Sequence, residues 1–292
     1  MSPLKSTLAF WQSQLGRASV RLLLYGVLIL WTAITLFGFT WVVLTSLKSN
    51  RELFTIKSIW GLPEVLQWEN YVRAWTRSKM GNFLLNSALV STASVLLINL
   101  VGSMAAYVLA RFRFAGNRLI LGAFILGSAI PLQLITVPLY LMFNDLGLLD
   151  SLVGLTMVYV AVSLPFTVFV LTGFFKSIPT ALEEAAVLDG ASEYGVFWHV
   201  MLPLAAPGVT TVTIFNFLGV WNEYLLALML INETDKMTIP LGLYNLQVVQ
   251  EYAADFTGLF AGFVIMLLPT IVAFIFLQER ISRGMTVGAL KG

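Results

Sequence analysis

The sequence predicts an all-α integral membrane protein with six transmembrane helices. Of its 292 residues, 58% are hydrophobic and 11% are charged, which is too apolar for a soluble domain of this size. Six segments are apolar over about the 20 residues that a helix needs to cross about 30 Å of hydrocarbon. They do not alternate with period two, so helices are favoured over a barrel. The six predicted spans are residues 22–46, 84–110, 119–143, 152–175, 208–231 and 256–277.

The first span follows three basic residues, Lys5, Arg17 and Arg21. It is too long for the core of a signal peptide and lacks a clear cleavage site, so we interpret it as a retained anchor. The loop 47–83 that follows mixes charges with tryptophan and tyrosine. This mixture fits a folded element at the membrane interface and fits simple interfacial anchoring equally well.

Small residues in the second and third spans predict close helix packing in lipid. Gly102, Ala106 and Ala110 recur every four residues in the second span, and the third span carries Ala123 and Gly127. Prolines in the third and fourth spans predict kinks near a pathway or, with equal weight, packing irregularities. These prolines are Pro131, Pro138 and Pro165.

The fifth span contains Glu223, the only ionisable side chain in the six predicted spans. A charge in lipid is costly and normally faces the helix bundle or water, so Glu223 is a functional candidate. With Asn222 and Tyr224 beside it, it is our candidate for the solute pathway. The alternative is a carboxylate at the interface that only forms local hydrogen bonds.

Counting Lys and Arg predicts that both ends of the chain are cytoplasmic. Ten of these residues fall on the side of the amino terminus and seven on the other side. Three arginines in the short turn 110–118 strengthen the prediction, whereas six basic residues in the loop 47–83 oppose it.

Composition and motifs exclude several functions. The net charge of +2 is not clustered as nucleic-acid binding requires, and with no cysteine and one histidine, His199, we expect no metal site. Neither a phosphate-binding Gly-x-x-x-x-Gly-Lys nor a Gly-x-Ser-x-Gly elbow occurs. One carboxylate near a span boundary is little provision for ion-coupled transport. Energy for uphill transport must therefore enter through a partner.

The polar insert 183–207 separates two strongly apolar blocks. Pro179 suits a first helical turn, with Ser177 as its cap, and Gly190 can supply the left-handed residue that ends this helix. Glu183 lies early in the helix, where the helix dipole favours negative charge.

A second short helix is predicted to follow. Ser192 can cap it, Phe197 lies on one face with Val200 and Met201, and Pro203 is expected to end it. Alanines at positions 185, 186 and 191 keep the surface low, so that another backbone could approach closely.

This insert resembles the EAA loop of permease subunits of binding-protein-dependent ABC importers. The residues in register are Glu184-Ala185-Ala186, Asp189-Gly190-Ala191, Phe197 and Leu202-Pro203-Leu204, closing at Pro207. The resemblance implies the type I ABC importer permease fold. It also implies that the loop is a pair of cytoplasmic coupling helices that docks on an ATPase subunit, with Glu183, Glu184 and the residues in register as the coupling site.

Further stretches resemble the carbohydrate-uptake branch, in particular the smaller permease subunit of maltose-type importers. They are Asn86-Ser87, the segment 105–112, Trp221-Asn222-Glu223-Tyr224 and the segment 284–292. The first 79 residues match only in layout. We therefore expect an amino-terminal helix and loop at 1–79, a transmembrane core at 80–278 and a cytoplasmic tail at 279–292.

The resemblance also implies partners. These are a second homologous permease subunit, two cytoplasmic ATPase subunits that bind ATP and Mg²⁺ in place of this chain, an extracytoplasmic solute-binding protein and lipid. Thr286 and Lys291 in the tail would contact the ATPase, and the loop 232–255 would face the binding protein. The implied cargo is a sugar or oligosaccharide. The alternatives are a polyol, glycerol phosphate or amino acid derivative in the same machine, an ion-coupled carrier, or a membrane scaffold.

Overall fold

The computed structural model describes residues 3–55, 60–76, 79–253 and 255–289, and describes side chains for 20–55, 60–76, 79–248, 255–272 and 275. Within these residues the structure is helical and contains no strand, which confirms the all-α class. The helices are α1 (Pro3–Ser46), α2 (Asn50–Leu53), α3 (Glu69–Thr76), α4 (Met80–Arg111), α5 (Asn117–Ala129), α6 (Leu132–Asp145), α7 (Leu152–Ser177), α8 (Thr180–Leu188), α9 (Glu193–Val196), the π-helix η1 (Phe197–Met201), α10 (Leu202–Leu204), α11 (Ala206–Trp221), α12 (Leu225–Leu230), the 3₁₀ helix η2 (Thr234–Lys236), α13 (Ile239–Ala253) and α14 (Phe256–Ala289).

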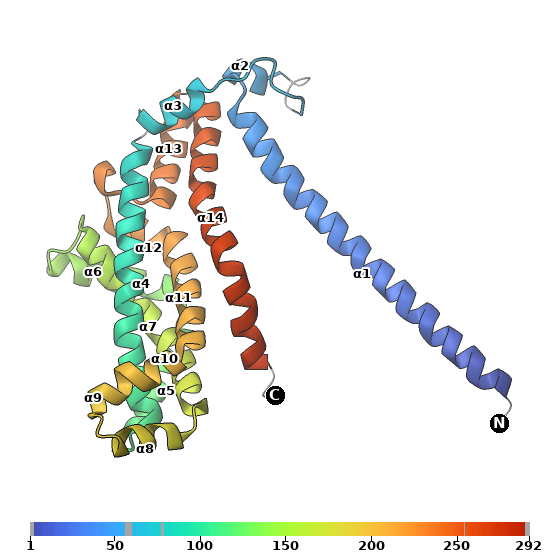
Figure 1. Cartoon of the computed structure of the whole chain (residues 1–292). Helices are drawn as coiled ribbons and strands as arrows, with labels where there is room; N and C mark the ends of the chain where they lie inside the picture. Colours follow the sequence, from blue (N-terminus) through green and yellow to red (C-terminus); the bar gives the residue numbers. More distant parts are fainter. Residues whose placement is uncertain (1–2, 56–59, 77–78, 254, 290–292) are drawn as a thin grey trace. The chain divides into compact units, whose positions relative to one another are not determined.

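The chain forms two compact units, Met1–Val72 with Ala254–Val264, and Arg73–Ala253 with Ile265–Gly292 (Figure 1). In the first unit, a buried amide closes the end of α1. The side-chain nitrogen of Asn70 donates to the carbonyl oxygens of Ser46 at 2.7 Å and Lys48 at 2.8 Å. Lys48 is fully buried. This burial lowers the pKa of its ammonium, and the nearby negative charge of Glu52 offsets only part of that effect. The start of the loop 47–83 is therefore folded.

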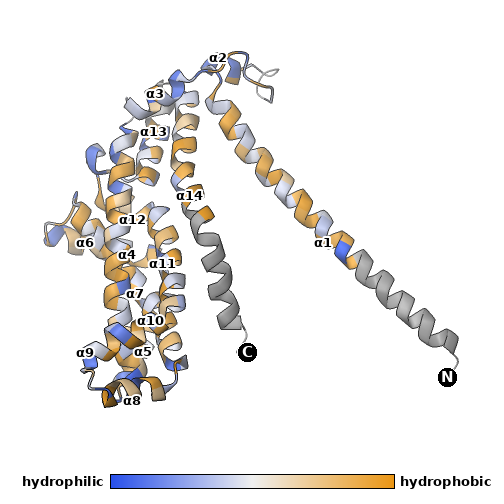
Figure 2. Ribbon diagram, in the orientation of Figure 1, coloured by the Kyte–Doolittle hydropathy of each residue, from blue (hydrophilic) through white to orange (hydrophobic). Residues whose placement is uncertain are grey.

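Three helices among the described residues are long and apolar enough to cross a membrane: Val20–Ser46, Met80–Arg111 and Leu152–Ser177. They confirm three of the predicted spans as continuous helices, and Figure 2 shows their apolar character. Two bent helix pairs pass the same test when each pair is counted as one span. They are α5 with α6, and the helix Glu193–Leu204 with α11, and they raise the number of candidate spans to as many as five. The described apolar part of α14, Phe256–Val272, is shorter.

Two predicted spans are not single helices. The segment 119–143 breaks at Pro131, where α5 and α6 meet at 103°. Because Pro131 has no N–H, it cannot continue the hydrogen bonds of α5, and its extended backbone forms the N-cap from which α6 starts. By contrast, Pro138 and Pro165 lie inside continuous helices, so the kinks expected there do not end a helix. The segment 208–231 also breaks, because α11 ends at Trp221 and α12 begins at Leu225.

In the second unit, α4 packs along α7 through small residues, as predicted. A Cβ atom at Gly102 would lie 2.7 Å from Cγ2 of Thr167, and Ala106 is fully buried. Gly127 lies against the ring of Pro165. Ala123 is exposed, so its predicted packing role is not seen.

The glycines of α11 provide a test of this packing. A Cβ atom at Gly208 would overlap the Phe174 ring on α7, whereas one at Gly219 would meet nothing within 4 Å. We expect Gly208→Ala to lower the free energy of unfolding by about 1–3 kcal/mol through overpacking. Gly219→Ala, the matched control, should be neutral or stabilising by about 1 kcal/mol. Thermal unfolding of both purified variants checks this, and equal melting temperatures would contradict the close packing of α11 on α7.

Candidate functional site

The helix α8 opens the insert 183–207 at one end of the second unit (Figure 1). Pro179 occupies its N-cap position, with an extended backbone and no side-chain cap. The prediction that Ser177 caps this helix is wrong. Its hydroxyl donates to the carbonyl of Phe174 at 2.8 Å, because Ser177 is the last residue of α7.

The end of α8 is a Schellman motif, in which a left-handed residue closes a helix by two backbone hydrogen bonds. Gly190 has a φ of +88°, as predicted. Its N–H donates to the carbonyl of Val187, and the N–H of Ala191 donates to that of Ala186, both at 3.0 Å. The two alanines also pack against the buried core, which explains why both are small.

The second helix begins as predicted, since the hydroxyl of Ser192 accepts a hydrogen bond from the N–H of Gly195 at 3.2 Å. The helix runs from α9 through the π-turn η1 and α10 and ends at Leu204, one residue beyond Pro203. In this wider turn, the N–H of Leu202 bonds to the carbonyl of Phe197, five residues back. The chain then bends by 74° into α11.

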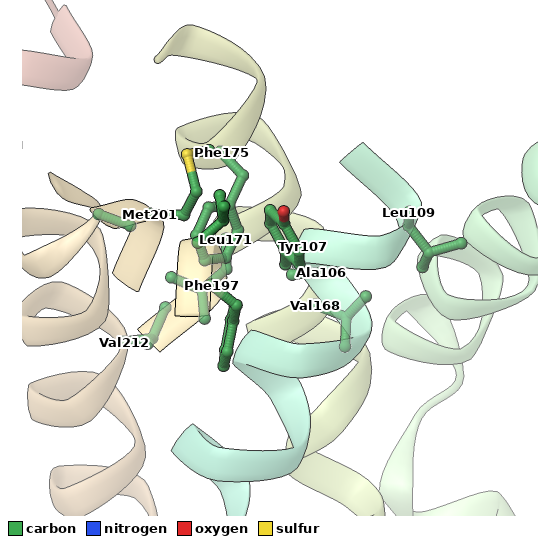
Figure 3. Close-up of a cluster of buried hydrophobic side chains, with 11 residues drawn as sticks. Ala106, Tyr107, Leu109, Val168, Leu171, Phe175, Phe197, Met201 and Val212 are labelled. Carbon is green, nitrogen blue, oxygen red and sulfur yellow. The ribbon is translucent and has the colours of Figure 1, made fainter. Parts of the chain in front are cut away.

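The inner face of the insert is an aromatic and aliphatic core (Figure 3). Met201 is fully buried, and the Phe197 ring lies 5.2 Å from the Tyr107 ring and 6.5 Å from the Phe175 ring. Aromatic pairs at these distances contribute roughly 0.5–1.5 kcal/mol beyond burial. Phe197 is thus a packing residue that holds the second helix on α4 and α7.

A polar cluster, which we name the Glu183 clasp, holds α8 to the end of α4. It consists of Tyr107, Arg111 and Glu183. The Tyr107 hydroxyl donates to Oε1 of Glu183 at 2.6 Å, and Nε of Arg111 lies 3.2 Å from Oε2, within ion-pair distance although its N–H is not aimed along a hydrogen bond. Nη2 of Arg111 donates to the carbonyl of Ile178 at 2.6 Å. The roles of Tyr107 and Arg111 were not predicted from the sequence, where their four-residue spacing at a helix end was the available signal.

The outer face of the insert is exposed and partly apolar. Glu184, Ala185 and Asp189 are exposed, as is Leu188, whose side chain is 88% exposed. Glu183 and Glu184 therefore differ, because the first is bonded within the chain and the second points outward. Leu188 was not singled out from the sequence. Leu182 and Val187 on the same helix are 44% and 55% exposed, so α8 presents an apolar patch of three side chains, Leu182, Val187 and Leu188.

Glu223, predicted for the solute pathway, forms three hydrogen bonds within the chain. Its carboxylate accepts from the Tyr159 hydroxyl at 2.8 Å and from the N–H groups of Leu226 at 2.8 Å and Ala227 at 3.2 Å. Glu223 thus caps the amino-terminal end of α12, where the fifth predicted span is broken. This is the local hydrogen bonding that the sequence left open as the alternative.

The neighbours of Glu223 lie at the same break. The Asn222 amide donates back to the carbonyl of Leu218 at 2.8 Å, and the Tyr224 ring lies 5.1 Å from the Tyr244 ring. The role of Asn222, Glu223 and Tyr224 in a solute path stays a prediction. The side chain of Thr286 and all of Lys291, predicted to contact an ATPase, lie outside the described residues.

The loop 231–238 lies at the other end of the unit from α8 and is held by Asp150. The carboxylate of Asp150 accepts hydrogen bonds from the N–H groups of Asn232 and Glu233, and its own N–H donates to Leu230. Burial raises the pKa of the Asp150 carboxyl, but the hydrogen bonds from Glu233 and Asn232 outweigh burial and hold the pKa below its ordinary value. The ammonium of Lys236 acts in the same direction.

This depressed pKa predicts acid sensitivity. The Asp150 contribution is fully present above the unfolded-state pKa of about 3.9 and is lost as pH falls through the lower folded-state pKa. We expect the melting temperature of the wild type to fall more steeply from about pH 5 to about pH 3 than that of Asp150→Asn. Asparagine keeps an acceptor oxygen and tolerates the φ of +51° at this position. Parallel slopes for the two proteins would contradict the assignment.

The profile of a protein family described as the inner membrane component of binding-protein-dependent transport systems matches residues 98–287. The chain belongs to this family. The match includes α8, the clasp and Glu223. The permease is therefore a transport component of an inner membrane, which agrees with its apolar spans.

Relatives of the permease have sugar-related names. It is 40% identical to the diacetylchitobiose uptake system permease protein NgcG of Streptomyces coelicolor, over 91% of this chain and 88% of that one. It is 37% identical to the sulfoquinovosyl glycerol transport system permease protein SmoH of Agrobacterium fabrum, over 88% and 89% of the two chains. Both relatives are named permease proteins, and the permease resembles each of them along most of its length.

A solved structure shares the fold of the permease. It is a chain of a bacterial ABC transporter involved in the import of the acidic polysaccharide alginate. The TM-score is 0.76 at 22% identity, and the match covers 96% of this chain and 98% of that one. At this identity the likeness concerns the fold alone.

Proposed function

We propose that the permease forms half of the membrane channel of an ATP-driven importer for a sugar or oligosaccharide, and that α8 through α10 couple it to a separate ATPase. The observation that carries the proposal is the insert itself. Its inner face packs against the aromatic core and is bonded to α4 through Glu183, and its outer face carries the exposed side chains of Glu184 and Leu188. Such an element can transmit a rigid-body displacement without absorbing it.

We infer that the importer contains a second homologous permease subunit, two ATPase subunits that bind ATP and Mg²⁺, and a solute-binding protein. An apolar patch around Leu188 and the carboxylate of Glu184 would suit a groove with a basic residue on the ATPase. The named relatives for diacetylchitobiose and sulfoquinovosyl glycerol support a carbohydrate cargo. Polyols, glycerol phosphate and amino acid derivatives are the alternatives within the same machine.

The topology that we propose has six spans with both ends of the chain in the cytoplasm. The helices α5 and α6 then count as one crossing, α11 and α12 count as another, and α14 supplies the last. Arg111, Arg113 and Arg118 follow the end of α4 that carries the insert, and basic residues concentrate on the cytoplasmic side of membranes. The loop 231–238 would then face the solute-binding protein.

Uptake by the purified complex in liposomes tests the function. We expect solute to accumulate only with ATP, Mg²⁺ and the cognate binding protein. Uptake that persists without ATP but follows a proton or sodium gradient would instead identify an ion-coupled carrier, and no solute movement at all would identify a scaffold. The solute itself is found as the ligand that copurifies with the binding protein or raises its melting temperature.

A further inference from the structure

The helix α4 is attached at one end to the insert and at the other end to the loop 231–238. At its carboxyl-terminal end, the Glu183 clasp joins it to α8. At its amino-terminal end, the Asn86 amide donates to the carbonyls of Asp235 at 2.8 Å and Met237 at 3.0 Å. The hydroxyl of Ser87 accepts from the N–H of Ile239 at 2.8 Å. One helix therefore holds both the insert and the loop 231–238.

A salt bridge adds to the attachment at the amino-terminal end. Nζ of Lys79 lies 2.5 Å from Oδ1 of Asp235. Both side chains are about half exposed, so this ion pair contributes little by itself. The amide bonds of Asn86, which is 8% exposed, carry the attachment.

The body of α4 is suited to carry a displacement between these ends. It has 32 residues without an interior break or proline, which corresponds to a length of about 48 Å. It is packed along α7 through Gly102 and Ala106, and this close packing leaves no space for α4 to slide along α7. A long helix packed in this way moves as a unit.

We propose that the Glu183 clasp is the joint through which a displacement of α8 reaches α4, and that α4 carries it to the loop 231–238. This inference rests on the proposed function. Tyr107 and Arg111 are then positioning residues, and Glu183 serves inside the permease while Glu184 faces the ATPase. The side chains of Arg111 and Glu183 are 8% and 20% exposed, so water screens their attraction weakly.

The bonds of the clasp are strong enough to transmit a displacement of α8 to α4. A hydrogen bond from a phenol to a carboxylate is charge-assisted and roughly twice as strong as a neutral one. Nη2 of Arg111 also holds the carbonyl of Ile178 at the end of α7, so the clasp joins three helices. Loosening it leaves the aromatic core around Phe197 in place but gives α8 freedom to tilt.

The experiment uses the absence of cysteine from the chain. Thr234→Cys places a single thiol on the exposed loop 231–238, where a fluorophore can report a change of environment. The labelled permease is assembled with its ATPase, and the probe is ATP with Mg²⁺. We expect an ATP-dependent change of emission that falls at least about threefold in Tyr107→Phe and in Glu183→Gln, while Tyr107→Phe retains ATP hydrolysis without solute.

Tyr140→Phe is the matched control, because no hydrogen bond of the Tyr140 hydroxyl occurs within the described side chains. It should keep the full emission change. An unchanged emission response in both clasp variants would overturn the inference and leave the proposed function standing. Emission and hydrolysis that fall together with the melting temperature would also overturn it, since the clasp would then only stabilise the fold. No ATP response in a labelled parent that still takes up solute would also overturn the inference, whereas a parent without ATP-driven uptake would overturn the proposed function itself.

Discussion

Replacing Gly190 by valine is expected to abolish ATP-driven uptake while the permease still inserts in the membrane. The left-handed conformation at this position costs a non-glycine residue about 1–2 kcal/mol, and a β-branched side chain suffers most. Steric overlap is not the reason, because a Cβ atom at Gly190 would meet nothing within 4 Å. The strain is relieved by turning the backbone, which breaks the Schellman hydrogen bonds and changes the angle between α8 and α9.

The control for this prediction is Gly190→Asn. Asparagine adopts the left-handed conformation more readily than other non-glycine residues, and it adds a similar volume in the same open space. We expect uptake near the wild-type rate for Gly190→Asn and a fall of at least about tenfold for Gly190→Val. Uptake in liposomes is measured beside the amount of each variant in the membrane. If both variants transport normally, the angle at Gly190 does not matter for coupling.

Local chemistry made much of the insert predictable from sequence. Gly190 and Ser192 are found where expected, because a left-handed closure and a side-chain cap each depend on a few neighbouring residues. Ser177 was predicted wrongly for a related reason. It had a second option that depends on the preceding helix, because Ser177 is the last residue of α7.

Tertiary contacts could not be predicted in the same way. Glu183 and Glu184 are adjacent residues of the same type, and the positions of Tyr107, 76 residues from Glu183, and of Arg111 distinguish them. Likewise, continuous apolarity defines a stretch of membrane-compatible residues but carries no information about direction. The 103° bend at Pro131 and the break after Trp221 therefore do not show in hydropathy.

Truncating Glu223 to alanine is expected to be among the most destabilising changes in the second unit. The substitution leaves the Tyr159 hydroxyl and two N–H groups of α12 without their acceptor. Tyr159 is 1% exposed, so its hydroxyl has little access to water as an alternative acceptor. Each unpaired buried group costs about 1–3 kcal/mol, and the sum is on the order of 3 kcal/mol or more. Thermal unfolding of the purified variant should show a fall of several degrees.

A conservative series separates this capping role from a role in solute binding. Glu223→Gln keeps one oxygen acceptor, and Tyr159→Phe removes only the hydroxyl group, so both should lie between the wild type and Glu223→Ala in stability. If capping is the role, uptake follows stability along the series and the KM for solute stays constant. If Glu223 contacts solute, Glu223→Gln raises KM at an unchanged melting temperature, because a hydroxyl of the cargo then loses a charged acceptor. The capping geometry favours the first outcome, in which the break between α11 and α12 is held by its own carboxylate.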